Sequence, residues 1–231
     1  MTILNVNKLS VKFDNSQILK DITFHLSRGQ YLAVVGPNGA GKSTLVKTLV
    51  HENKRYEGVF SFDKSIKTTG YVAQQNNDGS YFPATAREVI ISGLCRHHLL
   101  PFVSKSDKAR INTVIEELEL EDLLDKGYFN LSGGQKRAVL IARAFVASDK
   151  LLILDEPTAG LDVSSQSLLY SSIRKLNDKF KTSILMISHD LERIIKEADS
   201  VLCIEHELKF FGKTEDFIKT ETFKSLMEHH V

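Results

Sequence analysis

One stretch decides how this chain folds: Gly36-Pro37-Asn38-Gly39-Ala40-Gly41-Lys42-Ser43-Thr44. It fits in full the pattern G-x-x-x-x-G-K-[ST] of a phosphate-binding loop. The five residues before it, 31–35, form a short apolar run typical of a buried strand, and residues 44–50 after it are typical of a helix. This strand-loop-helix order is the context that the pattern requires, and it predicts a nucleotide-binding site.

The residue types in this loop suit a polyphosphate. The glycines let the backbone turn tightly and present a row of N–H groups, to which the helix N-terminus adds its positive end. Lys42 is expected to reach the β- and γ-phosphates, and the Ser43 hydroxyl to hold Mg²⁺. The alternative is a glycine-rich turn with a chance lysine, which the flanking strand and helix disfavour.

Composition narrows the class of protein. With 231 residues, 42% of them hydrophobic and 26% charged, the chain is long enough for one large domain with a sizeable core. Lys and Arg total 30 against 29 Asp and Glu, so the chain lacks the basic field of most nucleic-acid binders, and no nucleic-acid partner is expected.

Cysteines and apolar runs indicate the compartment. The two cysteines, Cys95 and Cys203, are too few for a disulfide framework, which favours a reducing cytoplasm. No apolar run approaches the roughly 20 residues of a membrane helix. If a membrane is involved, a partner is expected to supply the spans.

The order of periodic segments predicts an α/β chain with a helical insertion. Alternating strands are expected at 3–13, 18–26, 58–62 and 69–73, a loop at 74–80, and buried strands at 151–154, 183–188, 201–204 and 208–211. Helices are expected at 106–120, 121–125, 136–147, 164–180, 214–219 and 222–228, and Thr85 to Glu88 form a capping box before another helix. We therefore predict one domain, with a core at 1–74 and 147–213, a helical subdomain at 75–146 and a helical tail at 214–231.

Polar side chains follow three of the predicted core strands. The strand at 31–35 runs into the phosphate loop, the strand at 151–154 into Asp155 and Glu156, and the strand at 183–188 into His189. Ligands of parallel α/β sheets bind at the carboxyl ends of the strands, so these groups are expected to converge. Asp155 would then hold Mg²⁺, and Glu156 would accept a proton from the attacking water. A simple strand-ending turn is the alternative reading of Asp155 and Glu156.

A second specific stretch is Leu131-Ser132-Gly133-Gly134-Gln135, which precedes a predicted helix. The Ser132 hydroxyl, the Gly134 N–H and the helix N-terminus would together form another anion site. One chain does not easily bring both anion sites to the same phosphate.

With both loops, the chain resembles the ATP-binding cassette (ABC) ATPases from end to end. Residues 36–44 resemble their Walker A loop, 151–156 their Walker B strand and 131–135 their signature motif. The resemblance implies a P-loop NTPase (RecA-like) core with an antiparallel β-subdomain and an inserted α-helical signature subdomain. It also implies ATP hydrolysis with Mg²⁺, by a head-to-tail dimer that holds ATP between the Lys42 side of one chain and the Ser132 side of the other.

The resemblance assigns roles residue by residue. Gln74 matches the glutamine that touches Mg²⁺, His189 the switch histidine at the γ-phosphate, and Phe13 the position that stacks on adenine, although a core phenylalanine is an equal reading from spacing alone. The implied catalytic residues are Lys42, Gln74, Glu156 and His189, and the implied Mg²⁺ ligands are Ser43, Gln74 and Asp155. The implied nucleotide contacts are Phe13, Gly36, Pro37, Asn38, Gly39, Ala40, Gly41, Lys42, Ser43, Thr44, Ser132, Gly134, Gln135 and Asp162.

The signature helix departs from the family at one position. Ala138 stands where the family commonly has an arginine, which leaves open whether Arg137 takes over its contacts.

Residues 82–93 point to a class of transporter. Their Phe-Pro-x-Thr-x-x-Glu pattern resembles ATPases that serve zinc, manganese and iron uptake. The resemblance implies a subunit at the cytoplasmic face of the membrane that drives metal-ion import through a separate permease, fed by an extracytoplasmic solute-binding protein. The alternatives are an importer for cobalt, siderophores or vitamins, and a soluble cassette ATPase without a transport role.

Overall fold

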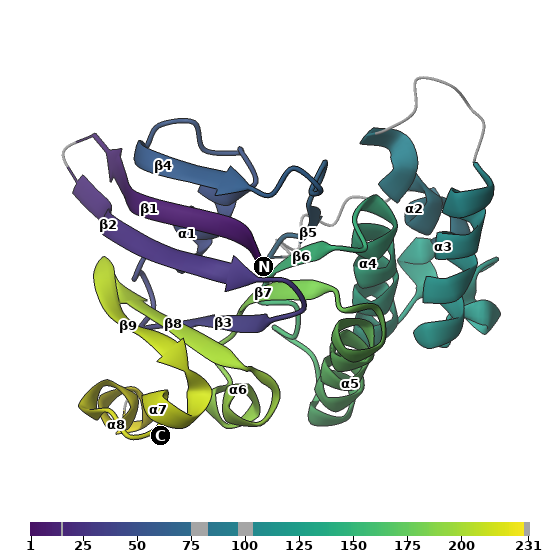
Figure 1. Cartoon of the computed structure of the whole chain (residues 1–231). Helices are drawn as coiled ribbons and strands as arrows, with labels where there is room; N and C mark the ends of the chain where they lie inside the picture. Colours follow the sequence, from purple (N-terminus) through teal and green to yellow (C-terminus); the bar gives the residue numbers. More distant parts are fainter. Residues whose placement is uncertain (15, 75–82, 97–103, 229–231) are drawn as a thin grey trace.

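The computed structural model describes residues 1–14, 16–74, 83–96 and 104–228 (Figure 1). Residues 75–80 of the expected loop lie outside these ranges, and so does Phe82, the first residue of the Phe-Pro-x-Thr-x-x-Glu pattern. Among the described residues, no helix combines the length and the apolar character needed to cross a membrane.

One sheet runs through the molecule (Figure 1). The nine strands in the described ranges follow the spatial order β4-β1-β2-β9-β8-β3-β7-β6-β5. All strand segments expected from the sequence are confirmed, with bounds that shift by at most two residues. They are β1 Thr2–Phe13, β2 Ser16–Ser27, β3 Tyr31–Val35, β4 Glu57–Phe62, β5 Gly70–Val72, β6 Leu151–Asp155, β7 Ser183–Ile187, β8 Ser200–Glu205 and β9 Glu207–Lys213.

The expected helices are present, with several differences. The signature helix begins at Gly133 instead of residue 136, the helices expected at 106–120 and 214–219 end at Glu117 and Phe217, and residues 121–123 form a 3₁₀ turn. The helix at 191–197 and the 3₁₀ turn at 128–130 were not expected. The α-helices are α1 Lys42–Leu49, α2 Ala86–Ile91, α3 Lys105–Glu117, α4 Gly133–Ala147, α5 Val163–Phe180, α6 Leu191–Glu197, α7 Thr214–Phe217 and α8 Glu221–Glu228; the 3₁₀ helices are η1 Ser92–Arg96, η2 Glu121–Leu123 and η3 Tyr128–Asn130.

The sheet has a parallel and an antiparallel part. Strands β5, β6, β7, β3 and β8 are parallel neighbours, whereas β1, β2 and β4 pair antiparallel. Every residue of β3, β6 and β7 is buried, as expected for parallel strands covered on both faces. The expected α/β core with an antiparallel β-subdomain is therefore confirmed.

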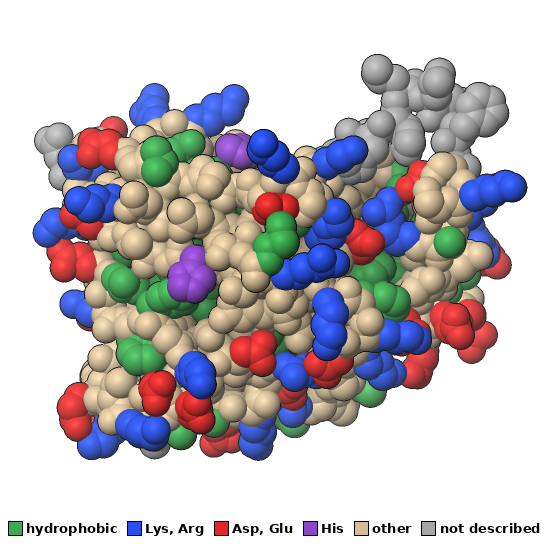
Figure 2. All heavy atoms as spheres, in the orientation of Figure 1, with side chains coloured by type: hydrophobic (Ala, Val, Ile, Leu, Met, Phe, Trp, Pro, Cys, Tyr) green, Lys and Arg blue, Asp and Glu red, His purple; other side chains and the backbone are tan. Residues whose placement is uncertain are grey.

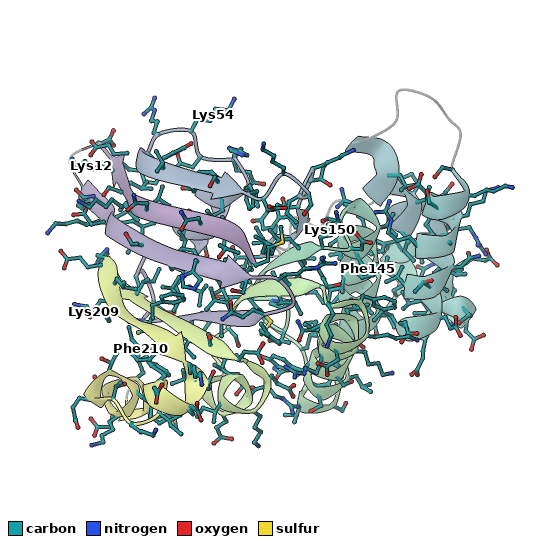
Figure 3. The ribbon with its side chains drawn as sticks, viewed as in Figure 1. Lys12, Lys54, Phe145, Lys150, Lys209 and Phe210 are labelled. Carbon is teal, nitrogen blue, oxygen red and sulfur yellow. The ribbon has the colours of Figure 1, made fainter. Side chains whose placement is uncertain are left out.

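Strand alternation divides the core between the two faces of the sheet. In β3, Leu32 and Val34 belong to the apolar cluster that contains α1 and the β1–β2 hairpin, whereas Ala33 and Val35 belong to the cluster under the other helices. Figure 3 labels Phe145 of α4 in this second cluster, where its ring lies 5.3 Å from that of Phe180. Both faces of the sheet are thus sealed around the central strands.

Helix α4 joins the helical region to the sheet. A Cβ at Gly70 of β5 would lie 2.3 Å from the backbone oxygen of Ala144, and one at Gly93 would lie 2.3 Å from that of Arg143. Only glycine allows these close approaches, so α4 is held tightly between β5 and η1. The division into core, helical subdomain and tail remains a prediction from the sequence.

The visible surface carries charge of both signs. In the view of Figure 2, Lys and Arg side chains and Asp and Glu side chains are both scattered over the face, and their totals in the sequence are nearly equal, at 30 and 29.

Candidate functional site

The phosphate loop has a backbone shape that only glycine supplies at two points. Gly36 has φ 145°, and a Cβ there would lie 2.0 Å from the backbone oxygen of Ile204. Gly41 has φ 94°, and a Cβ there would lie 2.6 Å from the side chain of Leu19. The loop is therefore pressed against β2 and β8, which holds its N–H groups in one arrangement.

Lys42 opens helix α1 and turns back over the loop. Its ammonium donates hydrogen bonds to the backbone oxygens of Gly36 at 2.7 Å and Pro37 at 2.8 Å. Burial lowers the pKa of Lys42, and the carboxylates of Glu156 and Asp155 oppose that shift. The lysine is thus a buried cation at the head of the loop, positioned for a phosphate oxygen.

Ser43 and Asp155 meet beside Lys42. The Ser43 hydroxyl donates to Oδ1 of Asp155 at 3.2 Å. Asp155 is fully buried at the end of β6, burial raises its pKa, and its Oδ2 has no hydrogen-bond partner among the described residues. A hydroxyl and a buried carboxylate with a free oxygen are the hard oxygen donors that Mg²⁺ prefers, so this donor pair fits the metal.

Glu156, which follows β6, contacts polar side chains that follow β5 and β7. It has φ 48°, and its backbone N–H donates to the oxygen of Ile187 at 3.2 Å. Its Oε1 contacts Nε2 of His189, which follows β7, and its Oε2 accepts from the amide of Gln74, which follows β5, at 2.8 Å. The convergence predicted for Glu156 and His189 is present, and Gln74, which the family resemblance assigns to Mg²⁺, is hydrogen-bonded to Glu156.

The signature stretch is an N-terminal cap of α4. The Ser132 hydroxyl accepts from the N–H of Gln135 at 3.3 Å, and the Gln135 side chain accepts from the N–H of Ser132 at 3.0 Å. No hydrogen bond or ion pair found among the described residues joins this cap to the phosphate loop. The two predicted anion sites are therefore two separate groups within one chain.

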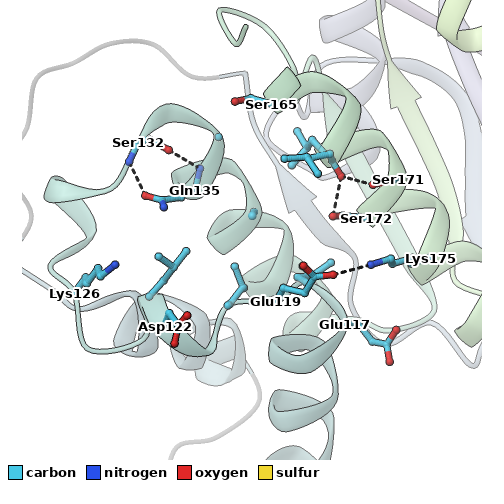
Figure 4. A pocket seen from close by; sticks show the side chains of 17 residues that line it. Glu117, Glu119, Asp122, Lys126, Ser132, Gln135, Ser165, Ser171, Ser172 and Lys175 are labelled. Carbon is cyan, nitrogen blue, oxygen red and sulfur yellow. Dashed lines mark hydrogen bonds and ion pairs between the residues drawn. The ribbon is translucent and has the colours of Figure 1, made fainter. Parts of the chain in front are cut away.

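A groove of about 570 Å³ lies between the start of α4, the end of α3 and α5 (Figure 4). Ser132, Gln135 and Ala138 line one wall, and Ser165 lines another. Gly134 lets α4 approach closely, since a Cβ there would lie 3.1 Å from the side chain of Ser165. The cap of α4 is thus packed against the first turn of α5.

Asp162 caps α5 at that same place. Its carboxylate accepts from the N–H groups of Ser164 at 3.1 Å and Ser165 at 3.0 Å, and from both hydroxyls. The Ser164 and Ser165 hydrogen bonds lower the pKa of Asp162 well below the usual range of a carboxyl. A lasting negative charge therefore stands at the helix N-terminus beside the signature stretch.

The profile of the ABC transporter family matches residues 19–159, which is more than half of this chain. The chain belongs to the ABC transporter family. The zinc uptake system ATP-binding protein ZurA of Listeria monocytogenes is 34% identical over 225 residues, covering 93% of this chain and 87% of that protein. The manganese transport system ATP-binding protein MntB of Halalkalibacterium halodurans is 35% identical over 227 residues, covering 95% and 89%.

Solved structures of the ABC family share the fold. An ATP-binding subunit of an ABC transporter superposes with a TM-score of 0.80 at 25% identity, covering 99% of each chain. The protein cbiO1 from Clostridium perfringens, part of the ABC transporter complex cbiONQ, superposes with a TM-score of 0.78 at 27% identity, covering 97% of this chain and 94% of that one. As an ABC ATPase, the chain binds nucleotide and hydrolyses ATP.

Arg137 and Ala138, at the point where the signature helix departs from the family pattern, have different surroundings. Arg137 is buried in the helical region near Tyr128, and burial lowers its pKa, whereas Ala138 lines the groove beside Ser132. Because the two side chains lie in different environments, Arg137 does not fill the place of an arginine at 138.

Phe13 is 43% exposed at the end of β1, and its role in adenine stacking stays a prediction.

The sequence analysis did not identify the residues that contact the phosphate loop and the His189 segment of this ABC ATPase site from other strands and helices. Ile204 and His206 brace the phosphate loop, the latter through its N–H on the oxygen of Ala40 at 3.1 Å. Tyr170 contacts Ser188 just before His189. Each of these three residues is distant in sequence from the segment that it contacts, and no local pattern marks it. The start of α6 could have been predicted from the sequence, because Asp190 is its N-cap and Asp is a preferred N-cap residue.

Proposed function

We propose that this ABC ATPase drives import of a divalent metal ion, zinc or manganese, through a separate permease. The observation that carries the proposal is likeness over nearly the whole chain, at 34% and 35% identity, to ATP-binding proteins named for zinc uptake and manganese transport. The ATPase itself does not bind the cargo in this proposal. It supplies the free energy of ATP hydrolysis.

The catalytic step is phosphoryl transfer to water. Glu156 accepts the proton of the attacking water, and its carboxylate is oriented for this by Gln74 and His189. Lys42 binds the β- and γ-phosphates in place of its loop carbonyls, and His189 contacts the γ-phosphate. Catalysis then rests mainly on positioning and charge stabilisation.

Mg²⁺ is expected at the buried end of β6. Ser43 and Asp155 would hold the ion, with the free Oδ2 of Asp155 as a donor atom, and Gln74 would be a further ligand. When bound, the ion would neutralise charge on the phosphate oxygens.

The complete site requires two chains. Ser132, Gly134 and Gln135 of one subunit contact the ATP held by the phosphate loop of the other, with Asp162 beside them. The separation of the two anion sites within one chain supports this arrangement. Closure of the dimer on ATP and its reopening after hydrolysis then move the permease.

The setting is the cytoplasmic face of the membrane. The described residues contain no helix suited to crossing a membrane, so the spans come from the permease. A solute-binding protein on the outer side delivers the metal to that permease and does not contact this chain.

The test is capture of the tagged full chain from detergent-solubilised native membranes, followed by reconstitution of the complex in liposomes. We expect a multi-span permease and ATP-dependent uptake of Zn²⁺ or Mn²⁺ into the lumen, and no uptake with the Lys42→Ala chain. Uptake of cobalt, a siderophore or a vitamin instead would reassign the cargo. Recovery of ribosomal or DNA-bound proteins without a membrane protein would reject the transport role.

A further inference from the structure

A buried tyrosine lies behind the catalytic histidine. Tyr170 projects from the middle of α5 and is 1% exposed. Its hydroxyl is hydrogen-bonded to the Ser188 hydroxyl at 2.9 Å, and Ser188 is also buried. This bond is a polar link between α5 and the end of β7.

Ser188 holds the backbone on both sides of His189. It directly precedes His189, and its hydroxyl accepts the backbone N–H of Asp190 at 3.1 Å. The peptide N–H that follows the histidine is therefore tied to the hydroxyl of the residue before it, and that hydroxyl is tied to Tyr170. His189 in turn contacts Glu156, so the chain of contacts runs from α5 to the proposed base.

The phenol ring is itself fixed. The guanidinium of Arg193 in α6 lies over the ring at 5.2 Å from its centre, and it donates to the Ser167 hydroxyl of α5 at 2.6 Å. Burial raises the pKa of Tyr170, and hydrogen bonding to Ser188 and Thr158 opposes that shift. Thr158 lies two residues after Glu156, so the phenol stands between the segments that carry Glu156 and His189.

A fixed Tyr170 hydroxyl would help to hold the catalytic side chains in position. Hydrolysis depends on holding His189 and Glu156 within a fraction of an ångström of their working positions, and such precision comes from neighbours locked by packing and hydrogen bonds. Tyr170 reaches His189 through Ser188, which directly precedes the histidine.

We propose that Tyr170 is a positioning residue for ATP hydrolysis, whose hydroxyl holds Ser188 and thereby sets His189 against Glu156. This inference rests on the roles proposed above for Glu156 and His189. It assigns to α5, whose N-cap Asp162 lies beside the signature stretch, a connection to the histidine through Ser188.

The experiment is steady-state ATP hydrolysis by the full chain and its Tyr170→Phe variant. Loss of one hydrogen bond of ordinary strength predicts a kcat lower by about five- to tenfold, with the KM for ATP unchanged. Tyr31→Phe is the matched control, because Tyr31 is equally buried and its hydroxyl contacts only the sulfur of Met186, at 3.3 Å, among the hydrogen bonds described. A Tyr170→Phe chain whose kcat equals that of Tyr31→Phe overturns the proposal.

A double-mutant cycle separates positioning from a merely structural role. If Tyr170 acts through Ser188, then Tyr170→Phe lowers kcat in the wild-type chain and has no further effect in a Ser188→Ala chain. Equal losses in both backgrounds overturn the proposal. Thermal melting of each variant checks that kcat is compared between folded proteins.

Two further variants keep this inference distinct from the proposed function. Glu156→Gln and His189→Ala are expected to stall hydrolysis. If they turn over at the wild-type rate, the proposed catalytic roles fail, and the positioning proposal fails with them. If they stall while Tyr170→Phe matches its control, only the role of Tyr170 is rejected.

Discussion

At the scale of single residues, Asp155 shows a conflict between stability and function. Its carboxylate is fully buried, receives one hydrogen bond from Ser43 and keeps one oxygen without a partner among the described residues. Burial raises its pKa, which means that the folded protein disfavours the ionised form. A charge of this kind persists in a core where a ligand such as Mg²⁺ needs it.

Asp155→Asn is therefore expected to stabilise the metal-free protein and to abolish ATP hydrolysis. With EDTA at neutral pH, we expect a gain of about 1 kcal/mol, because the variant removes a poorly satisfied buried charge. The native pKa lies above the unfolded one, so the gain shrinks as the pH falls through the native pKa of Asp155 and the wild-type carboxyl takes up a proton.

Thermal melts from neutral to acid pH measure this effect, with the exposed Asp149→Asn as the control. A variant that melts below the wild-type chain at neutral pH would contradict the account of Asp155 as a destabilising charge.

At the scale of elements, two helices share one capping device with different surroundings. Thr85 and Glu88 form a capping box at the start of α2, and Ser132 and Gln135 form one at the start of α4. Both hydroxyls bind the N–H of the residue three positions later. The backbone hydrogen bond of the cap is thus the same in both helices, whereas a role at a phosphate is proposed for Ser132 alone.

Thr85→Ala and Ser132→Ala are expected to cost similar stability, about 1 kcal/mol each, the usual value of an N-cap hydroxyl. In a chain of this size that lowers Tm by roughly 2–4 °C. Only Ser132→Ala is expected to lower kcat as well, because its hydroxyl is assigned to the ATP of the other subunit. Paired melting curves and ATPase assays test this, and an equal kcat for the two variants would argue against a phosphate role for Ser132.

At the scale of the whole molecule, the two anion sites predicted from the sequence lie on different elements, and we propose that each is half of a site shared by two chains. The phosphate loop and Glu156 lie at the carboxyl ends of the parallel strands, whereas Ser132 caps α4 beside Asp162 of α5. A site completed by a second chain explains why each half is well formed by itself.

Glu156→Gln is expected to bind ATP and remain dimeric, because binding closes the dimer and the missing base prevents reopening. Size-exclusion chromatography with light scattering should show twice the monomer mass with Mg²⁺ and ATP. Glu156→Gln combined with Ser132→Arg should stay monomeric while still binding ATP, since the arginine obstructs the other chain's phosphate. A monomeric Glu156→Gln chain saturated with ATP would contradict the shared site.

Local features explain how much of the fold was predictable. The phosphate loop, the capping boxes and the continuous apolar runs of β3, β6 and β7 each depend on neighbours a few residues away, so the sequence displays them directly. Helix α6 was missed because it has only seven residues, too few for its periodicity to stand out. The start of α4 was placed three residues late because Gly133 and Gly134 do not suggest helix, although the cap at Ser132 begins it there.

The sequence by itself therefore determined the family, the order of strands and helices, and which side chains stand at strand ends. Only the tertiary structure decided that Gln74 bonds to Glu156, that Arg137 is buried while Ala138 faces the groove, and that Tyr170 braces the segment before His189. The physical reason is the range of the interactions. Periodicity records which face of an element is apolar, but the contacts that aim a catalytic side chain join residues far apart in the chain, and packing of the whole sheet and its helices brings them together.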